Sequence, residues 1–394
     1  MDANVTSDEH NKIARDLAAK GTVLLKNDAN VLPLGASSSI HIAVIGSEAL
    51  NPTVHGGGSG QVVSYYVSSP LDAIREKLGV TTGDKNSTTT NCDASGKRCV
   101  TYAYSSKDAA KIAANADVAI VFGMTTSSEG GDRGDLNLNN DANDLISSVA
   151  GVNKRTIAVA VTPGALLTPW SDEVAAVIVS FMPGQEYGTF LMSVELLSLS
   201  LNHTPHQSQP LTGHAVADIL FGDVNPSARL PITFPNTENE MNLTDSQWPG
   251  VNLVSTYSEG LLVGYRYYAA KQITPKFCFG HGLSYTKFEY DTLEITSDAV
   301  MFDVKNVGHV DGSTVPQMYF GFPESSGEPP LQLKGFQKIF LKAGESSRVT
   351  FNVTQRTVSI WNTKIHDWGV VKGSHHVYVG ESSLDIRLSG SYTA

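Results

Sequence analysis

The sequence is poor in the features that mark several large classes of protein. Its 28 lysines and arginines stand against 39 aspartates and glutamates, so it lacks the clustered positive charge that binding to a nucleic acid requires. No apolar run approaches the length needed to span a bilayer. The opening MDANVTSDEHNKIARDL has neither a basic start nor an apolar stretch, so we predict no signal peptide in this chain. These absences favour a globular protein with no nucleic-acid or membrane partner and, on the residues alone, a cytoplasmic one.

Cysteine is also scarce, with three in 394 residues. Cys92 and Cys99 flank the polar loop CDASGKRC and can pair, which would leave Cys278 over. No CxxC or cysteine–histidine spacing indicates a metal, and we expect no cofactor. Five N-x-S/T sequons favour a secreted protein only weakly, because such triplets are common by chance.

The first two thirds of the chain alternate strands and helices. Apolar runs that end in glycine, at 40–46 and 117–123, are typical of strands buried on both faces of a parallel sheet. Further strands are expected at 100–104, 156–161 and 175–181, and helices at 11–19, 71–78, 107–114 and 141–149. The pattern predicts a doubly wound α/β sandwich domain over residues 1–285, with ligands at the carboxyl ends of its strands.

After about Tyr285 the pattern changes to strict alternation. Val300, Phe302 and Val304 alternate with polar residues, and 349–353 and 377–379 repeat the pattern. Turn sequences such as AGES and KGSH separate these runs. The alternation predicts an all-β, antiparallel sandwich over residues 286–394.

The strongest candidate for chemistry is the loop SSEGGDRGDL, which directly follows the strand at 117–123. A carboxylate flanked by glycines, Glu129, is placed there to reach a ligand, and Asp132 and Arg133 can bind hydroxyls or orient it. The alternative is an ordinary solvated acidic loop. From this loop alone the alternative is the better interpretation, because charged loops are common.

Two other segments are weaker candidates. In HGGGSGQV, residues 55–62, successive glycines let the backbone approach a ligand closely. The glycines come ten residues after the strand, which disfavours a dinucleotide-binding loop. In the second segment, Trp170 is either a ring for a sugar to stack on or a core residue, and the Gln185–Glu186 pair of PGQEYG is either functional or a helix cap.

Taken together, the motifs resemble glycoside hydrolase family 3. They run in order as TVLLKNDANVLPL, IAVIG, GGGSGQV, EGGDRGDL, PGQEYG, ADILFGDVNPSARLPITFP, VGYRYY and FGHGLSYT, and cover nearly the whole chain. Family members have a TIM-like barrel, then an α/β sandwich domain, and often a fibronectin III-like domain. The resemblance implies that this chain is the second and third of these and lacks the barrel, which becomes its expected partner.

The resemblance also implies a mechanism and its residues. The family hydrolyses β-linked glucosides and oligosaccharides with retention, using two carboxylates. The nucleophile belongs to an S-D-W motif on the barrel, and here Ser171-Asp172 is followed by glutamate. By its match Glu129 is the general acid/base and Ser59 contacts the sugar. Asp132, Arg133 and Trp170 are further substrate-binding candidates, and Gly131 stands where many members have an aromatic residue.

Two interpretations of the whole chain follow. The first is the C-terminal part of an extracellular β-glucosidase-like hydrolase that is inactive alone. The second is a non-catalytic carbohydrate-binding or partner module that completes a barrel on another chain. In either case we expect Glu129 and Ser59 on one exposed surface at the carboxyl edge of the sheet, with an exposed apolar face around Trp170.

One segment, residues 189–213, fits neither domain pattern. It starts apolar without periodicity and ends polar with two prolines. In the family, PGQEYG runs directly into a helix such as the one expected at HAVADILFG. The alternative is a genuine surface loop, since long insertions cost little closure entropy.

We predict that 189–213 is translated intron. Sequencing of the transcript should show that most messenger copies lack these codons, because their removal restores the family spacing. Transcripts that keep the codons in most copies would contradict the prediction.

Overall fold

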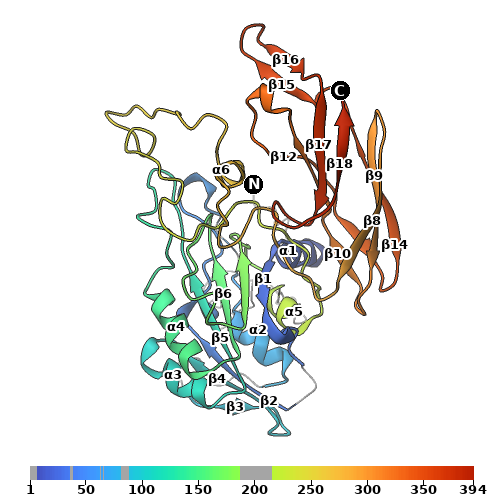
Figure 1. Cartoon of the computed structure of the whole chain (residues 1–394). Helices are drawn as coiled ribbons and strands as arrows, with labels where there is room; N and C mark the ends of the chain where they lie inside the picture. Colours follow the sequence, from blue (N-terminus) through green and yellow to red (C-terminus); the bar gives the residue numbers. More distant parts are fainter. Residues whose placement is uncertain (1–6, 36–38, 63, 65, 81–87, 187–214) are drawn as a thin grey trace. The chain divides into compact units, whose positions relative to one another are not determined.

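The structure of the chain is a computed structural model that describes residues 7–35, 39–62, 64, 66–80, 88–186 and 215–394. Its contacts divide it into two compact units (Figure 1). The first comprises Met1–Gly164 with Thr168–Val224, and the second comprises Ala165–Leu167 with Asn225–Ala394. The predicted insertion at 189–213 lies outside the described residues, so its status stays a prediction.

The first unit is built on a seven-stranded sheet of order β1-β7-β6-β5-β2-β4-β3. Neighbours from β7 to β4 are parallel, while β1 and β3 join the edges antiparallel. The strands are β1 Val23–Asn27, β2 Ile40–Ile45, β3 Asn91–Cys92, β4 Arg98–Ala103, β5 Val118–Met124, β6 Thr156–Val161 and β7 Ala176–Ser180. Every residue of β6 and β7 is buried, as a parallel sheet covered on both faces requires.

Helices accompany this sheet (Figure 1). They are α1 Asp8–Gly21, α2 Pro70–Lys77, α3 Ser106–Ala114, α4 Ala142–Val152 and α5 Ala215–Phe221. Ser69 caps α2 by accepting from the N–H of Asp72, and Pro70 occupies the first turn. Arg15 of α1 binds the buried Asp218 of α5 through two hydrogen bonds of 2.6 and 2.7 Å, which joins these two helices. The predicted α/β class is confirmed.

The strand order reverses beside β2. The chain passes from β2 to β4 on one side and later returns to β5 on the other. Ile45, the last residue of β2, pairs with Val121 of β5, and β5 continues to Met124. Reversal at this point opens a crevice at the carboxyl edge, where doubly wound proteins bind ligands. The loops that follow β2 and β5 therefore leave the same edge of the sheet from neighbouring strands.

The pairing of Cys92 with Cys99, left open by the sequence, is present in the structure. It joins β3 to β4, whose residues 92 and 99 are directly opposite each other. Cys278 is a free, buried thiol.

The second unit contains a four-stranded sheet, β12-β11-β17-β18, and a three-stranded sheet, β14-β9-β8. Its strands are β8 Phe288–Ile295, β9 Ala299–Asn306, β10 Gly312–Thr314, β11 Gln317–Gly321, β12 Gln332–Phe336, β13 Ile339–Leu341, β14 Ser346–Asn352, β15 Ser359–Asn362, β16 Asp367–Val370, β17 Ser374–Gly380 and β18 Ile386–Thr393. Phe302, Phe320 and Val379, from three different strands, belong to one shared core. The predicted all-β sandwich is confirmed.

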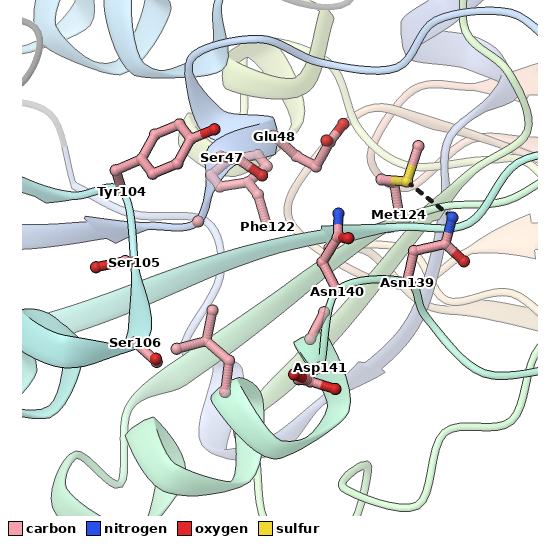
Figure 2. Close-up of a pocket in the computed structure, with 14 residues that line it drawn as sticks. Ser47, Glu48, Tyr104, Ser105, Ser106, Phe122, Met124, Asn139, Asn140 and Asp141 are labelled. Carbon is pink, nitrogen blue, oxygen red and sulfur yellow. Dashed lines mark hydrogen bonds between the residues drawn. The ribbon is translucent and has the colours of Figure 1, made fainter.

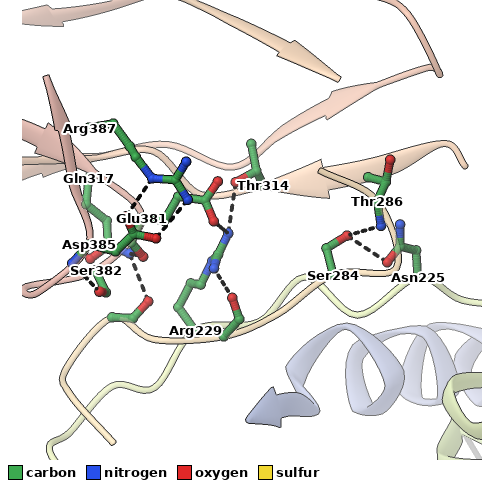
Figure 3. Close-up of polar contacts among 12 residues, drawn as sticks. Asn225, Arg229, Ser284, Thr286, Thr314, Gln317, Glu381, Ser382, Asp385 and Arg387 are labelled. Atoms are coloured by element: carbon green, nitrogen blue, oxygen red, sulfur yellow. Dashed lines mark hydrogen bonds and ion pairs between the residues drawn. The ribbon is translucent and has the colours of Figure 1, made fainter. Parts of the chain in front are cut away.

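Residues 225–285 contribute the helix α6 Tyr265–Lys271 and pack onto this sandwich. Arg229 donates to the carbonyl of Gly282, to Thr314 Oγ1 at 2.9 Å and to Glu381 Oε2 at 3.3 Å (Figure 3). Asn225 Oδ1 accepts from both Ser284 Oγ and Tyr285 N at 2.8 Å. The compact unit therefore begins at Asn225, upstream of residue 285, and the domain boundary expected at 285 stays a prediction.

None of the helices in the described ranges has the length and apolar character needed to cross a membrane. The longest, α1, has 14 residues.

Limited proteolysis should yield a resistant C-terminal fragment that begins near residue 225. The contacts of Arg229 and Asn225 hold the start of this segment on the sandwich, which should slow cleavage between residue 225 and the sandwich. Mass spectrometry of the digest identifies the new N-terminus. A resistant fragment that begins near residue 286, with 225–285 degraded, would contradict this division.

Candidate functional site

Two loops at the carboxyl edge of the sheet pair with each other. Residues 55–61 follow β2 and residues 125–131 follow β5. Gly57 and Ser128 form a parallel bridge, and the N–H of Gly57 donates to Ser127 O at 2.9 Å. An isolated parallel contact thus joins the loops that follow β2 and β5.

Glycine is required in this pairing because the two backbones come very close. A Cβ on Gly56 would lie 3.0 Å from Ser127 O, and a Cβ on Gly57 would lie 2.7 Å from Ser128 Oγ. A Cβ on Gly58 would overlap the Cβ of Glu129, and Gly58 also has a φ of +78°. The three glycines fit the segment Ser127–Glu129 residue by residue, which is more specific than a flexible turn.

The contact between Ser59 and Glu129 is the result of this fit. The backbone N–H of Ser59 donates to Glu129 Oε2 at 2.7 Å, and both residues are exposed. The expected proximity of Ser59 and Glu129 on one exposed surface is confirmed. Their roles in catalysis stay predictions.

Ser59 also sets the protonation of the carboxyl. Hydrogen bonds from the Ser59 side chain, and secondarily from its backbone, lower the pKa of Glu129 below its usual value, since they stabilise the charged form. Glu129 in this chain is therefore a carboxylate at neutral pH. It can accept hydrogen bonds or a proton, whereas acting as an acid at that pH would require a further group that raises its pKa.

The segment Gly184–Glu186 holds the glycine loop at both ends. Val54 O accepts from the N–H of Gly184 at 3.1 Å, and Gln185 O accepts from the N–H and hydroxyl of Ser68 at 3.0 and 2.9 Å. Tyr66 donates to the buried carboxyl of Glu186. Burial raises the pKa of Glu186 to about 7. The PGQE motif thus supports the loop that carries Ser59, a role the sequence alone did not indicate.

Two other predicted site residues follow Glu129 on the same loop. Asp132 is exposed, and Arg133 is half-buried with its guanidinium beside the backbone of Gly164. Gly131 is exposed, and a Cβ there would meet no atom within 4 Å. The substrate-binding roles of Asp132 and Arg133 stay predictions.

The expectation for Trp170 was wrong. Its side chain is completely buried, and the indole N–H donates to Asn143 Oδ1 at 2.8 Å. A ring buried on both faces has no surface on which a sugar can stack, and it cannot form an exposed apolar face. Trp170 is a core residue whose polar atom is satisfied.

A cavity of about 390 Å³ lies at the same edge of the sheet (Figure 2). Ser47 and Glu48 line it after β2, Tyr104 to Ser106 after β4, and Asn139 to Asp141 before α4. Glu48 is nearly buried, accepts from Thr53 N at 2.7 Å, and has a pKa raised by desolvation. Sequence analysis missed these residues, although their position directly after strands beside the reversal point was the available signal.

The sequence matches the glycosyl hydrolase family 3 C-terminal domain over residues 22–197 and 205–285, and a fibronectin type III-like domain over residues 314–383. The unmatched residues 198–204 fall within the predicted insertion at 189–213, whose remaining residues are inside the match.

Similar proteins include "Probable beta-glucosidase L" of Aspergillus terreus, which is 36% identical over 99% of this chain and 54% of its own length. "Thermostable beta-glucosidase B" of Acetivibrio thermocellus is 36% identical over 99% and 49%, respectively. The crystal structure of beta-glucosidase D2-BGL from Chaetomella raphigera superimposes with a TM-score of 0.81 at 32% identity, covering 98% of this chain and 55% of that one.

This chain spans about half the length of the curated relatives it matches. Its two units reproduce the family fold, and its GGGS and SSEGG segments come together at the edge of the sheet where the sequence placed them. The chain belongs to glycosyl hydrolase family 3, of which it carries the C-terminal domain followed by a fibronectin type III-like domain.

Proposed function

We propose that this chain supplies the general acid/base, Glu129, of a retaining β-glucosidase-like hydrolase that cleaves β-linked glucosides or oligosaccharides. The observation that carries the proposal is the exposed carboxylate of Glu129, held 2.7 Å from the N–H of Ser59 by glycines that fit only in this arrangement. A positioned carboxylate facing open space can reach the oxygen between a sugar and its leaving group.

The proposal requires a second carboxylate from outside this chain. Retaining hydrolysis needs two carboxyl groups about 5 Å apart, one as nucleophile and one as acid/base. Among the described residues, Glu129 is the carboxylate that hydrogen-bonds between the paired loops. We therefore propose that the nucleophile belongs to the part of the relatives that this chain does not match, and that the chain alone is inactive.

The pKa of Glu129 gives this requirement a physical reason. Hydrogen bonds from Ser59 lower the pKa of Glu129. At neutral pH the carboxyl has therefore already lost its proton, and it cannot act as an acid. A neighbouring nucleophilic carboxylate and exclusion of water would both raise the pKa, because both disfavour a second negative charge. The domain missing from this chain would thus supply the nucleophile and, by raising the pKa of Glu129, let this carboxyl hold a proton taken up from water.

An extracellular location is part of the proposal. The Cys92–Cys99 disulfide supports it, since disulfides persist mainly in oxidising compartments.

The first test is activity with and without the unmatched half of the Aspergillus terreus relative. The chain alone should not hydrolyse an aryl β-glucoside, and the mixture should. Glu129→Gln should lower kcat of the mixture about 10²- to 10⁴-fold. Asp135 is an exposed carboxylate on the same loop, and Asp135→Asn should leave kcat unchanged.

Turnover by the chain alone that is lost in Glu129→Gln would contradict the proposal and would point to a second carboxylate within this chain. Full activity of the Glu129→Gln mixture would instead favour a non-catalytic binding module.

The second test asks whether Gly58 holds the Glu129 carboxylate in its position beside Ser59. Gly58→Ala places a Cβ onto Glu129 and should break the Ser59 contact, which would raise the pKa of Glu129 because the charged form loses its donor. Gly60→Ala is the matched control, since its Cβ would meet no atom within 4 Å. Carboxyl NMR titration of this chain measures both, with Glu129→Gln assigning the resonance. An unchanged pKa in Gly58→Ala would show that the glycine does not position the carboxylate.

A further inference from the structure

The segment 244–263 of the second unit displays an unusual number of apolar side chains to solvent. Seven large apolar residues within it are exposed: Trp248, Val251, Leu253, Val254, Tyr257, Leu261 and Val263. Leu253 is fully exposed at 107%, and Tyr257 is 80% exposed. Soluble proteins rarely expose contiguous apolar patches, and such patches mark surfaces where another molecule binds.

Internal hydrogen bonds hold this segment in a defined conformation. Thr244 O accepts from Trp248 N at 2.9 Å, and Asp245 O accepts from Gly250 N at 2.9 Å. Gln247 Nε2 donates to Glu259 Oε2 at 3.0 Å, which ties the start of the segment to its end. Several polar groups of the segment thus hydrogen-bond to one another, while seven of its apolar side chains are exposed to solvent. A loop that stabilised itself by burying its apolar side chains would show the opposite arrangement.

Leu253 is the clearest sign of an external role. Val251 and Val254 bond to each other at 2.9 and 3.0 Å, so Asn252 and Leu253 form a two-residue turn. Both have positive φ, 52° and 63°, as in the type I′ turn that favours glycine at the second position. Leucine is strained in this conformation. In this chain its side chain buries nothing that would offset the strain.

We propose that the segment 244–263 is the docking surface for the half of the family relatives that this chain does not match. This inference rests on the proposed function, in which that half supplies the nucleophile. The relatives carry both halves in one protein, and this chain covers 54% and 49% of two of them. If the unmatched half of these relatives covers a surface of the matched half, the same surface would be exposed in this chain.

The charge of the segment favours a protein partner over a lipid surface. Between residues 244 and 263 the charged side chains are Asp245 and Glu259, and there is no lysine or arginine. An anionic membrane would repel this segment. Apolar and aromatic side chains with little charge are instead typical of the core of a stable protein interface.

The test is the affinity of the full chain for the unmatched half of the Aspergillus terreus relative, produced separately and measured by calorimetry. Leu253→Gly should weaken binding about tenfold or more, as expected for a leucine buried at an interface. Its melting temperature should not fall, since glycine adopts positive φ freely. Ile365→Ser is the matched control: it removes an exposed apolar side chain, 63% exposed, from another loop of the same unit, and should leave binding unchanged. Hydrogen exchange in 244–263 should slow when the partner half is added.

Three results would overturn the proposal: no binding of the partner half, equal binding by Leu253→Gly and the original chain, or an effect of Leu253→Gly confined to self-association in sedimentation. The aryl β-glucosidase activity of the same mixtures separates this proposal from the proposed function. Activity lost in Glu129→Gln with binding unaffected by Leu253→Gly refutes the docking surface alone. Binding weakened by Leu253→Gly with activity retained in Glu129→Gln refutes the acid/base role alone.

Discussion

The close approach of the glycine loop to the segment after β5 is the constraint on which the candidate site depends. Because β2 and β5 are parallel neighbours, the loops that follow them leave the same edge of the sheet. Gly56, Gly57 and Gly58 then let the two backbones approach closely enough for Ser59 to donate to Glu129. The PGQE segment holds the same loop at Val54 and Ser68. The position of one carboxylate thus rests on the sheet, on three residues without a Cβ, and on a third segment from a distant part of the chain.

This arrangement prepares a carboxylate but does not by itself prepare an acid. The donors that orient Glu129 also stabilise its charge and lower its pKa. Enzymes that use two carboxylates resolve this conflict by placing the second one nearby. If the second carboxylate is in another domain, catalysis depends on domain docking as well as on residue identity. The proposed docking surface at 244–263 concerns the same dependence, because it would keep the two carboxylates at a fixed separation.

The segment 244–263 exposes apolar side chains to solvent, whereas Trp170 does not. The sequence interpretation placed the exposed face at Trp170, whose ring the structure buries completely. Seven exposed apolar residues instead lie in one segment of the second unit that has no helical or strand periodicity. Its turns and internal hydrogen bonds, from Thr244 to Glu259, hold these side chains outward without regular secondary structure.

The sequence by itself determined the fold class and the neighbourhood of the site. Buried strands such as β6 are recognisable because burial on both faces leaves a continuous apolar run, and β9 because burial on one face leaves alternation. Glu129 and Ser59 were expected together since both follow strands of one parallel sheet. Only the tertiary structure decided what depends on contacts between distant residues: the protonation of Glu129, the burial of Trp170, the packing of 225–285 on the sandwich through Arg229, and the exposure of Leu253. Local periodicity reports which face of an element is buried, but it carries no information about which distant segment covers it.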